Sequence, residues 1–371
     1  MVSQDVGILP DARPPRTSLH LEQVWYLTAG VASDLLIDFR TEPPSVTCGA
    51  GVGVSDGFEG TAVFTEPYSG NLLFYTDGRT VFSGASNQML ANGAGLNGDP
   101  SSTEAALISP KYNSANQGFY VFTNTTNVGS PSSIAYSEID LSLGPDGTVT
   151  EKNVTLLTGN VGEGLDLLPH PNGQDFWVIS YDGADNIAAF LVSESGVSTT
   201  PIRSSTGLTG QVMRASINHT LDYDTLVMSQ NYGGANGVVA VADFDRGTGT
   251  VSPATVIATG DLGYHATFSG DGSKVYFVRG TEGWMGQAYQ YDLLTDTETL
   301  LGGSALGASK LAIDGKLYWA GHGKASLGVV NNPDAAGTAC DFVPDAFHLN
   351  GCMSGYGIPN QTASYIDYVV N

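Results

Sequence analysis

The side chains that could do chemistry are spread along this chain and do not form a compact motif. The six histidines show neither a His-x-His nor a His-Glu-x-x-His spacing, so a histidine-based metal site is not predicted. No Gly-x-Ser-x-Gly nucleophile motif and no phosphate-binding glycine loop is present. His265 is expected on an inner strand beside Tyr264, where it either faces a central channel or is simply hydrogen-bonded. His322 lies in a Gly-containing loop that either turns the chain or holds a ligand.

Carboxylates are plentiful, and a pair of them is what a glycoside hydrolase needs. Turns and strand ends account for most of them equally well. Asp-Gly and Asn-Gly loops resemble half of a calcium loop, but none completes the twelve-residue pattern, so no cofactor is expected and Ca²⁺ stays an option. The acidic residues considered are Asp166, Asp175, Asp182, Asp185, Asp222 and Asp224.

Aromatic residues in glycine-rich loops give the predicted binding site. Trp284 and Met285 lie among glycines in residues 280–286, and Tyr232 lies in a similar loop earlier in the chain. An aromatic side chain in such a loop often stacks on a sugar or anchors a partner. Alternatively, the tryptophan folds back onto the edge of a sheet. The predicted binding residues are Trp284, Met285, Tyr232, His265 and His322.

The elements that must position these residues are short strands joined by tight turns. The clearest unit is residues 268–277, where an alternating strand meets Asp271-Gly272 and a second apolar strand follows. Asp-Gly suits such a turn because both residues tolerate positive φ. Looser copies return every 45–60 residues or so, which is typical of a β-propeller.

Six full units are predicted, beginning near residues 60, 105, 164, 212, 264 and 310. Strands around Trp25 and Leu36 would share a further blade with a C-terminal strand at residues 365–370. Pairing both termini in one sheet would close the ring and remove open edges. The predicted fold is therefore an all-β propeller of seven four-stranded blades, with six or eight blades as alternatives, spanning residues 21–371.

The charge balance bears on the partners of the protein. The formal net charge is −23, from 37 acidic and 14 basic residues. A basic footprint for nucleic acid is therefore missing, and docking on anionic lipid is disfavoured. No apolar run is long enough for membrane insertion. We expect an extracellular or cell-surface location, although no signal peptide is visible and a virion appendage or an intracellular location stays open.

Three further features of the chain lead to local predictions. Cys340 and Cys352 could form a disulfide, which leaves Cys48 free or paired elsewhere. Residues 1–20 contain three prolines and two arginines and are expected to form an extended arm, which either mediates self-association, such as a filament, or is a disordered leader. Asn-x-Ser/Thr sequons occur at Asn124, Asn153, Asn218 and Asn360.

A series of short motifs runs in fixed order from about residue 23 to 362. Together these motifs resemble β-propeller domains of large secreted or cell-surface proteins from gliding, polysaccharide-degrading bacteria. The resemblance implies the fold and an adhesin-like surface role, and it implies no catalytic residues. The immunoglobulin-like repeats and sorting tail of those proteins are not seen here, which favours a stand-alone propeller. The matching stretches are residues 25–26, 70–82, 89–96, 99–108, 170–179, 290–293, 327–333 and 354–360.

These observations favour a non-enzymatic binding or assembly module whose partner is a surface polysaccharide or a protein. The alternative is a carbohydrate-active hydrolase or lyase with carboxylates at the channel mouth. A metal- or quinone-dependent oxidoreductase is a third hypothesis, which the scattered histidines disfavour. Converging Asp, His and Arg side chains in a pocket at the channel mouth would favour an enzyme, and a plugged mouth with apolar patches elsewhere would favour binding.

Overall fold

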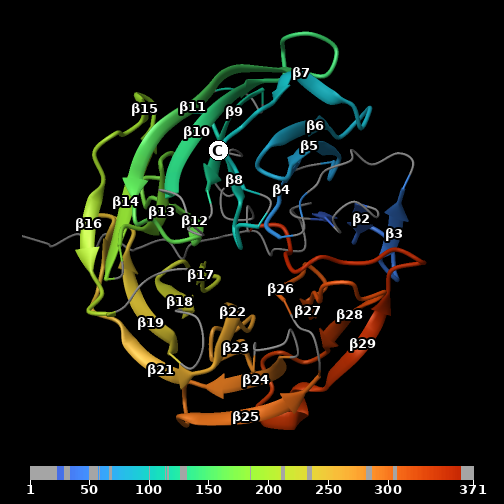
Figure 1. Ribbon diagram of the computed structural model, residues 1–371, viewed down its shortest axis with the longest axis vertical. Helices are drawn as coiled ribbons and strands as arrows, with labels where there is room; N and C mark the ends of the chain where they lie inside the picture. The colour runs from blue at the N-terminus through green and yellow to red at the C-terminus, as the bar shows by residue number, and fades with distance from the viewer. Residues whose placement is uncertain are drawn as a thin grey trace, which may run out of the picture.

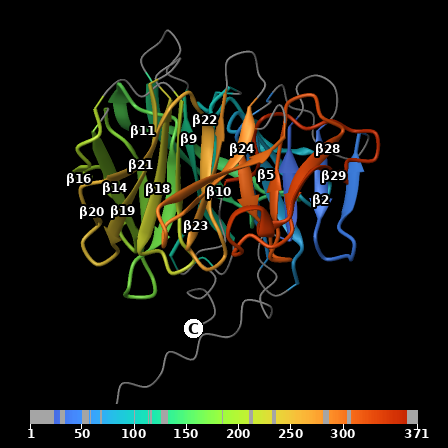
Figure 2. The same cartoon turned by 90° about the horizontal axis from the view of Figure 1, so that it is seen from below.

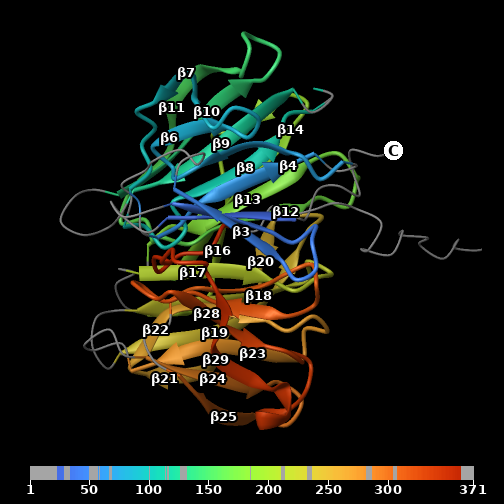
Figure 3. The ribbon, with the colours of Figure 1, turned by 90° about the vertical axis from the view of Figure 1, so that its right-hand side faces the viewer.

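The strands form a ring around a central channel (Figure 1). The computed structural model describes residues 23–360, apart from residues 29–33, 50–56, 58, 67–68, 100, 113, 115–116, 126–131, 184, 210–213, 232–235, 281–285 and 304–306. In the view of Figure 2 the ring appears edge-on, and in Figure 3 the strands of successive sheets are stacked across the molecule. The propeller part of the prediction is confirmed.

Hydrogen bonds join the described strands into six sheets. The first holds β1 (Val24–Leu27), β2 (Leu35–Asp38) and β3 (Ser45–Cys48). The second has eight strands: β4 (Ala62–Thr65), β5 (Leu72–Thr76), β6 (Thr80–Ser83), β7 (Met89–Ala94), β8 (Ala106–Pro110), β9 (Gly118–Asn124), β10 (Ser132–Asp140) and β11 (Thr148–Gly159). Its two halves meet where β7 pairs with β11, at Ala91 and Thr148.

The remaining sheets contain five, five, four and four strands. The third holds β12 (Leu165–Pro169), β13 (Phe176–Tyr181), β14 (Asn186–Ser193), β15 (Gly196–Val197) and β16 (Ile202–Ser205). The fourth holds β17 (Arg214–His219), β18 (Thr225–Asn231), β19 (Gly237–Asp245), β20 (Thr250–Val251) and β21 (Thr255–Gly260). The fifth holds β22 (Leu262–Phe268), β23 (Lys274–Arg279), β24 (Gln287–Asp292) and β25 (Thr297–Gly302). The sixth holds β26 (Ser309–Leu311), β27 (Leu317–Trp319), β28 (Ser326–Val330) and β29 (Phe342–His348), with a short 3₁₀ helix, η2 (Gly337–Cys340), before its last strand.

The predicted hairpin at residues 268–277 forms as expected. Gly272 has a φ of 72°, and the carboxylate of Asp271 accepts a hydrogen bond from the backbone N–H of Ser273 at 2.9 Å. The side chain and the glycine thus fix a tight turn between β22 and β23. The predicted units also begin within a few residues of the inner strands β4, β8, β12, β17, β22 and β26.

Apolar side chains fill the space between neighbouring sheets. Phe64 of β4 and Phe74 of β5 both contact Phe119 of β9, with ring centroids 4.7 and 4.9 Å apart. Trp25 of β1 contacts Tyr318 of β27 at 5.7 Å, edge to face. The first sheet therefore packs against the last one, which brings the two ends of the described chain together.

The described C-terminal segment enters the channel instead of extending the first sheet. Pro359 forms a parallel bridge with Thr61, and the backbone N–H of Asn360 donates to the Thr61 carbonyl at 2.7 Å. The side-chain amide of Asn360 donates to the carbonyls of Ala106 at 3.2 Å and Leu165 at 2.7 Å. One buried amide thus joins β8 to β12 at the axis of the ring.

Several local predictions can be compared with these coordinates. The disulfide joins Cys48 to Cys352 and leaves Cys340 free and buried, so the predicted pairing of Cys340 with Cys352 is wrong. The closing strand at residues 365–370 and the arm at residues 1–20 lie outside the described residues. No helix in the described part of the chain has the length and apolar character needed to cross a membrane.

The sequons are poor acceptors for a glycan in the folded chain. Asn124, Asn218 and Asn360 are buried, and Asn153 is half-buried. Each of the four side-chain amides donates a hydrogen bond to a backbone carbonyl. A glycan on any of these nitrogens would replace such a bond.

Replacing Asn360 by Ala should destabilise the ring, because two inner-strand carbonyls lose their shared donor at a buried position. We expect a loss of roughly 1–3 kcal/mol in the free energy of unfolding. Asn332→Ala, at an exposed position, is the control and should change stability by less than about 0.5 kcal/mol. Urea unfolding of both variants measures this, and equal stabilities would show that the Asn360 amide does not join the strands.

Candidate functional site

Three glutamates precede inner strands and lie together at one end of the channel. Glu59 comes before β4, Glu104 before β8 and Glu163 before β12. Their exposed fractions are 7%, 3% and 1%. Carboxyl groups are rarely buried to this extent unless they are paired or hydrogen-bonded, so their local contacts decide what they can do.

Glu59 and Glu163, together with the groups that contact them, form the part of this cluster that we call the channel mouth. Tyr264 Oη donates a hydrogen bond to Glu59 Oε2 at 2.9 Å, and Ser101 Oγ donates to Glu59 Oε1 at 3.3 Å. Thr103 donates to Glu163 Oε2 twice, from its backbone N–H at 2.8 Å and from its hydroxyl at 2.6 Å. The two carboxyl groups are therefore oriented by separate donors.

Aromatic contacts connect the channel mouth with the surface. The ring of Tyr264 lies 5.9 Å from that of Tyr356, which in turn stacks on His322 at 4.6 Å with an interplanar angle of 13°. Tyr356 is half-buried and His322 is exposed. Arg214, at the start of β17, is also exposed, and its charge acts on both Glu59 and Tyr356. The mouth therefore combines buried carboxyl groups with an exposed cation and a flat ring surface.

The environment of Glu59 changes its acidity. Burial, reinforced by the negative charge of Glu163, raises the pKa of Glu59 to about 8, although Tyr264, Arg214 and Ser101 act in the opposite direction. Burial also raises the pKa of the Tyr264 phenol well above its ordinary value. At neutral pH the channel mouth thus holds a protonated carboxyl and a protonated phenol beside the carboxyl of Glu163.

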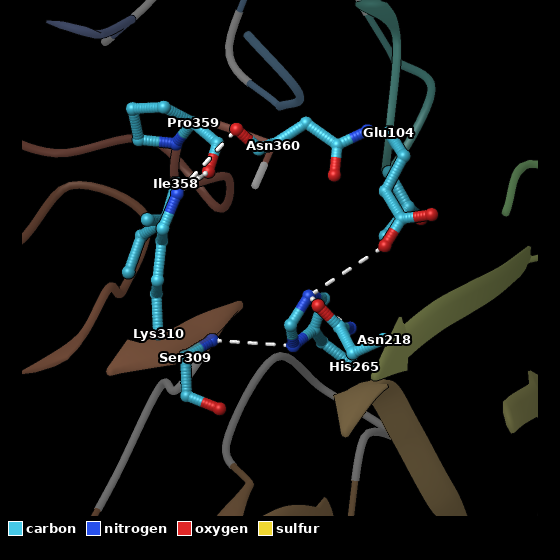
Figure 4. Close-up of a pocket in the computed structure, with 9 residues that line it drawn as sticks. Glu104, Asn218, His265, Ser309, Lys310, Ile358, Pro359 and Asn360 are labelled. Atoms are coloured by element: carbon cyan, nitrogen blue, oxygen red, sulfur yellow. Dashed lines mark hydrogen bonds and ion pairs between the residues drawn. The ribbon is translucent and has the colours of Figure 1, made fainter. Parts of the chain in front are cut away.

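A small cavity lies beside this cluster (Figure 4). Its empty space is about 270 Å³, including the part that opens to solvent, which is below the usual range for ligand pockets. In Figure 4, Glu104 and Asn218 approach His265 from one side, while Lys310 lies near the segment of Ile358, Pro359 and Asn360. The lining residues are Thr103, Glu104, Asn218, His265, Ser309, Lys310, Ile358, Pro359 and Asn360.

Glu104 connects three sheets through its carboxyl group. Its Oε2 accepts hydrogen bonds from the backbone N–H groups of Leu165 at 2.5 Å and Ile217 at 3.3 Å. Its Oε1 lies 3.8 Å from His265 Nε2. Burial raises the pKa of Glu104 well above its ordinary value. Burial and the nearby charge of Lys310 lower the pKa of His265 to about 3. The imidazole is therefore neutral at pH 7, so this approach is not an ion pair.

The channel contains a second, closer pair of this kind. His219 Nδ1 lies 2.7 Å from Asp166 Oδ2, and both side chains are buried. Asp166 also accepts the backbone N–H of Leu167 at 2.8 Å. No group of three or more His, Cys, Asp or Glu side chains that could hold a metal ion occurs in the described ranges. The polar groups of the channel are thus suited to proton transfer and to hydrogen bonding.

The structure separates the predicted binding residues. Trp284, Met285 and Tyr232 lie outside the described residues, so their binding role stays a prediction. His265 lines the cavity and approaches Asn218 at 3.2 Å, so it both faces the channel and is hydrogen-bonded. His322 is exposed near the mouth. The histidine and aspartate patterns in the sequence do not predict the cluster of buried glutamates.

A signal for these glutamates is present in the sequence. Each stands directly next to a small residue, and each comes just before an apolar strand that begins a repeat unit: Glu59-Gly60, Glu104-Ala105 and Glu163-Gly164. Inner strands of a propeller converge on the channel. A carboxylate recurring at their starts could therefore have been placed at one end of the ring.

Comparison with known proteins supports the fold. No protein-family model matches the chain, and no curated protein is similar to it in sequence. Its structure is similar to a candidate 6-phosphogluconolactonase from Bacteroides uniformis, with 13% identity, a TM-score of 0.50, and coverage of 82% of this chain and 91% of the other. A puromycin-hydrolysing peptidase from Mycobacterium tuberculosis is also similar, with 13% identity, a TM-score of 0.47, and coverage of 92% of this chain and 49% of the other. A glucose dehydrogenase is similar with 11% identity, a TM-score of 0.43, and coverage of 73% of this chain and 95% of the other.

The prediction of a non-enzymatic adhesin-like or assembly module is contradicted by this comparison. The similar structure with a TM-score of 0.50 is described as a candidate 6-phosphogluconolactonase and not as an adhesin. At 13% identity the likeness establishes the propeller fold and not the reaction. The resemblance to surface propellers of gliding bacteria therefore holds for the fold alone.

The pH dependence of stability should report the buried Glu59. Its pKa is about 8 in the folded chain, against an ordinary value of 4.5, so between pH 5 and 8 the unfolded chain has released a proton that the folded chain keeps. Stability should fall across this window. The stability of Glu59→Gln, which mimics the neutral carboxyl, should not fall across this window. At pH 8 its free energy of unfolding should exceed that of the wild type by on the order of 3 kcal/mol.

Denaturant unfolding at pH 4, 6 and 8 measures this difference. Near pH 4 the two proteins should be about equally stable, because Glu59 is protonated in both states of the wild type. Glu194→Gln, at an exposed turn, is the matched control and should follow the wild type at every pH. A constant offset between Glu59→Gln and the wild type would show that Glu59 ionises normally.

Proposed function

We propose that the protein is a carbohydrate-active enzyme whose reaction takes place at the channel mouth, and that this reaction is hydrolysis of a glycosidic bond. The observation that carries the proposal is the buried carboxyl of Glu59, held by Tyr264 beside the second carboxyl of Glu163. Glycoside hydrolysis uses two such groups in different protonation states.

Glu59 is the proton donor in this proposal. Its raised pKa keeps the carboxyl protonated at neutral pH. The bond from Tyr264 Oη fixes its orientation. A carboxylic acid in this state can protonate the leaving oxygen of a glycosidic bond as the bond breaks.

Glu163 is the proposed base. Both donors from Thr103 bond to Oε2 and fix the orientation of the carboxyl. In the reaction a water molecule attacks the anomeric carbon, its proton passes to Glu163, and the leaving oxygen takes the proton of Glu59. The electron pair of the broken bond stays on that oxygen, so the products are two sugars and the two carboxyls have exchanged charge.

The exposed part of the mouth provides a surface for the sugar. Tyr356 and His322 stack almost in parallel, and an exposed ring face of this kind suits the apolar face of a pyranose. Arg214 adds an exposed positive charge to the mouth. The surface polysaccharide expected as a partner is, in this proposal, the substrate.

Hydrolysis is favoured over elimination by the state of the tyrosine. A lyase needs a base that removes a carbon-bound proton, and a phenol does this only when it is deprotonated. The pKa of Tyr264 is raised well above its ordinary value by burial and by Glu59. Tyr264 therefore keeps its proton and acts as a donor to Glu59.

Glu59→Gln and Glu163→Gln should each lower kcat on an unactivated glycoside by about 10²–10⁴. For Glu59→Gln the loss should be much smaller with aryl glycosides whose leaving groups are acidic, because these need no proton. The wild-type kcat/KM should fall as the pH rises through about 8, where Glu59 loses its proton. Release of reducing sugar and of aryl alcohol from a substrate panel measures these effects.

Glu194→Gln serves again as the control and should retain full activity. Circular dichroism and thermal melting confirm that each variant is folded. If folded Glu59→Gln were as active as the wild type on every substrate that is turned over, or if no glycoside were cleaved by the wild type, the proposal would be wrong.

We also infer that the ring has seven blades and that the protein works outside the cell. The eight-stranded sheet counts as two blades, because its halves are paired at Ala91 and Thr148 alone in the described register. The Cys48–Cys352 disulfide is typical of an oxidising compartment. Self-association through residues 1–20 and contact through Trp284 remain predictions.

A further inference from the structure

The small cavity at the axis of the ring is enclosed by strands of different sheets (Figure 4). Its walls come from the start of β8, from β17, β22 and β26, and from residues 358–360. The empty space of about 270 Å³ includes the part that opens to solvent, so the enclosed part suits a molecule of a few atoms at most. A molecule bound here would touch strands that do not pair with one another.

One oxygen of Glu104 has no hydrogen-bond partner among the described residues. Its Oε2 accepts from two backbone N–H groups, whereas Oε1 makes no hydrogen bond, although the side chain is only 3% exposed. In Figure 4, Oε1 is turned toward His265. A buried carboxyl oxygen left without a partner is costly, so we expect a group from outside the chain to meet it.

The imidazole of His265 has an unmatched requirement of its own. The backbone N–H of Ser309 donates to Nδ1 at 3.4 Å, and the amide nitrogen of Asn218 lies 3.2 Å from Nε2. Both neighbours are donors, but a neutral imidazole has a single acceptor nitrogen. The backbone N–H of Ser309 cannot turn away, so Nδ1 is the acceptor and the hydrogen of the ring is on Nε2. Glu104 Oε1, 3.8 Å from Nε2, is too distant to accept it directly.

From these two groups we infer that the cavity binds one water molecule, which accepts from His265 Nε2 and forms a second hydrogen bond with Glu104 Oε1. A water molecule fits within hydrogen-bond distance of two atoms that are 3.8 Å apart. It can also donate to a carboxylate or accept from a protonated carboxyl, so it suits Glu104 in either state.

The charges on the cavity walls favour a neutral molecule over an ion. A cation would face the ammonium group of Lys310, and an anion would face the carboxyl group of Glu104. The water joins β8 to β22, as the Asn360 amide joins β8 to β12. The inference concerns the axis of the ring and holds whether or not the channel mouth hydrolyses glycosides.

Crystals of the wild-type protein, grown with bromide and rubidium in place of chloride and potassium, test the inference. We expect a peak of electron density within about 3.2 Å of both Glu104 Oε1 and His265 Nε2, with no anomalous signal. Well-ordered density for both side chains without such a peak would overturn the inference. An anomalous peak from bromide or rubidium would overturn it in favour of an ion site.

Magnetic relaxation dispersion of the water signal provides a second test in solution, because it counts water molecules that stay inside a protein for a long time. His265→Phe removes the bridging nitrogen and should hold one such water fewer than the wild type. His322→Phe, at an exposed position, is the matched control and should keep the wild-type number. An unchanged number in His265→Phe, shown to be folded by circular dichroism, would contradict the inference. If His265→Phe does not fold, the wild-type crystals decide.

Discussion

The ring depends on polar bonds made at its axis, where the inner strands of different sheets meet. The Asn360 amide donates to Ala106 and Leu165, and the Glu104 carboxyl accepts from Leu165 and Ile217. In the described sheets, inner strands of neighbouring sheets do not pair with one another, so their backbone groups need other partners. Buried side chains supply these partners, and each of them joins strands that are far apart in the sequence.

Burying carboxyl groups near the axis costs free energy, and the same burial changes the pKa of Glu59. A buried carboxyl loses its hydration, and the neutral form is then favoured unless a cation or several donors compensate. Glu59 receives two side-chain donors, yet burial and Glu163 still raise its pKa to about 8. The same environment that destabilises the folded chain at high pH thus provides a proton donor at neutral pH. Residues placed against the local preference for stability are expected at functional sites.

The sequence was informative where structure is local. The Asp271-Gly272 turn and the starts of the repeat units follow from nearest neighbours, because turn geometry and strand alternation are set within a few residues. The channel is different, since Glu59 and Tyr264 are 205 residues apart and meet only when the ring closes. The pairing of Cys48 with Cys352, separated by 304 residues, is non-local in the same way. From the local sequence alone, a glutamate beside a glycine is predicted to be a turn residue. Its position at the axis follows only from the arrangement of several sheets.

The two imidazole–carboxyl pairs of the channel show how far burial alone determines chemistry. His219 Nδ1 and Asp166 Oδ2 lie 2.7 Å apart and share a direct hydrogen bond. Glu104 lies 3.8 Å from His265, and its donors are backbone N–H groups that carry no charge. Burial, reinforced by the charge of Lys310, lowers the pKa of His265 to about 3, so the neutral ring supplies no positive charge to Glu104. The two imidazole–carboxyl pairs therefore differ in distance, because one makes a direct hydrogen bond at 2.7 Å and the other stays 3.8 Å apart.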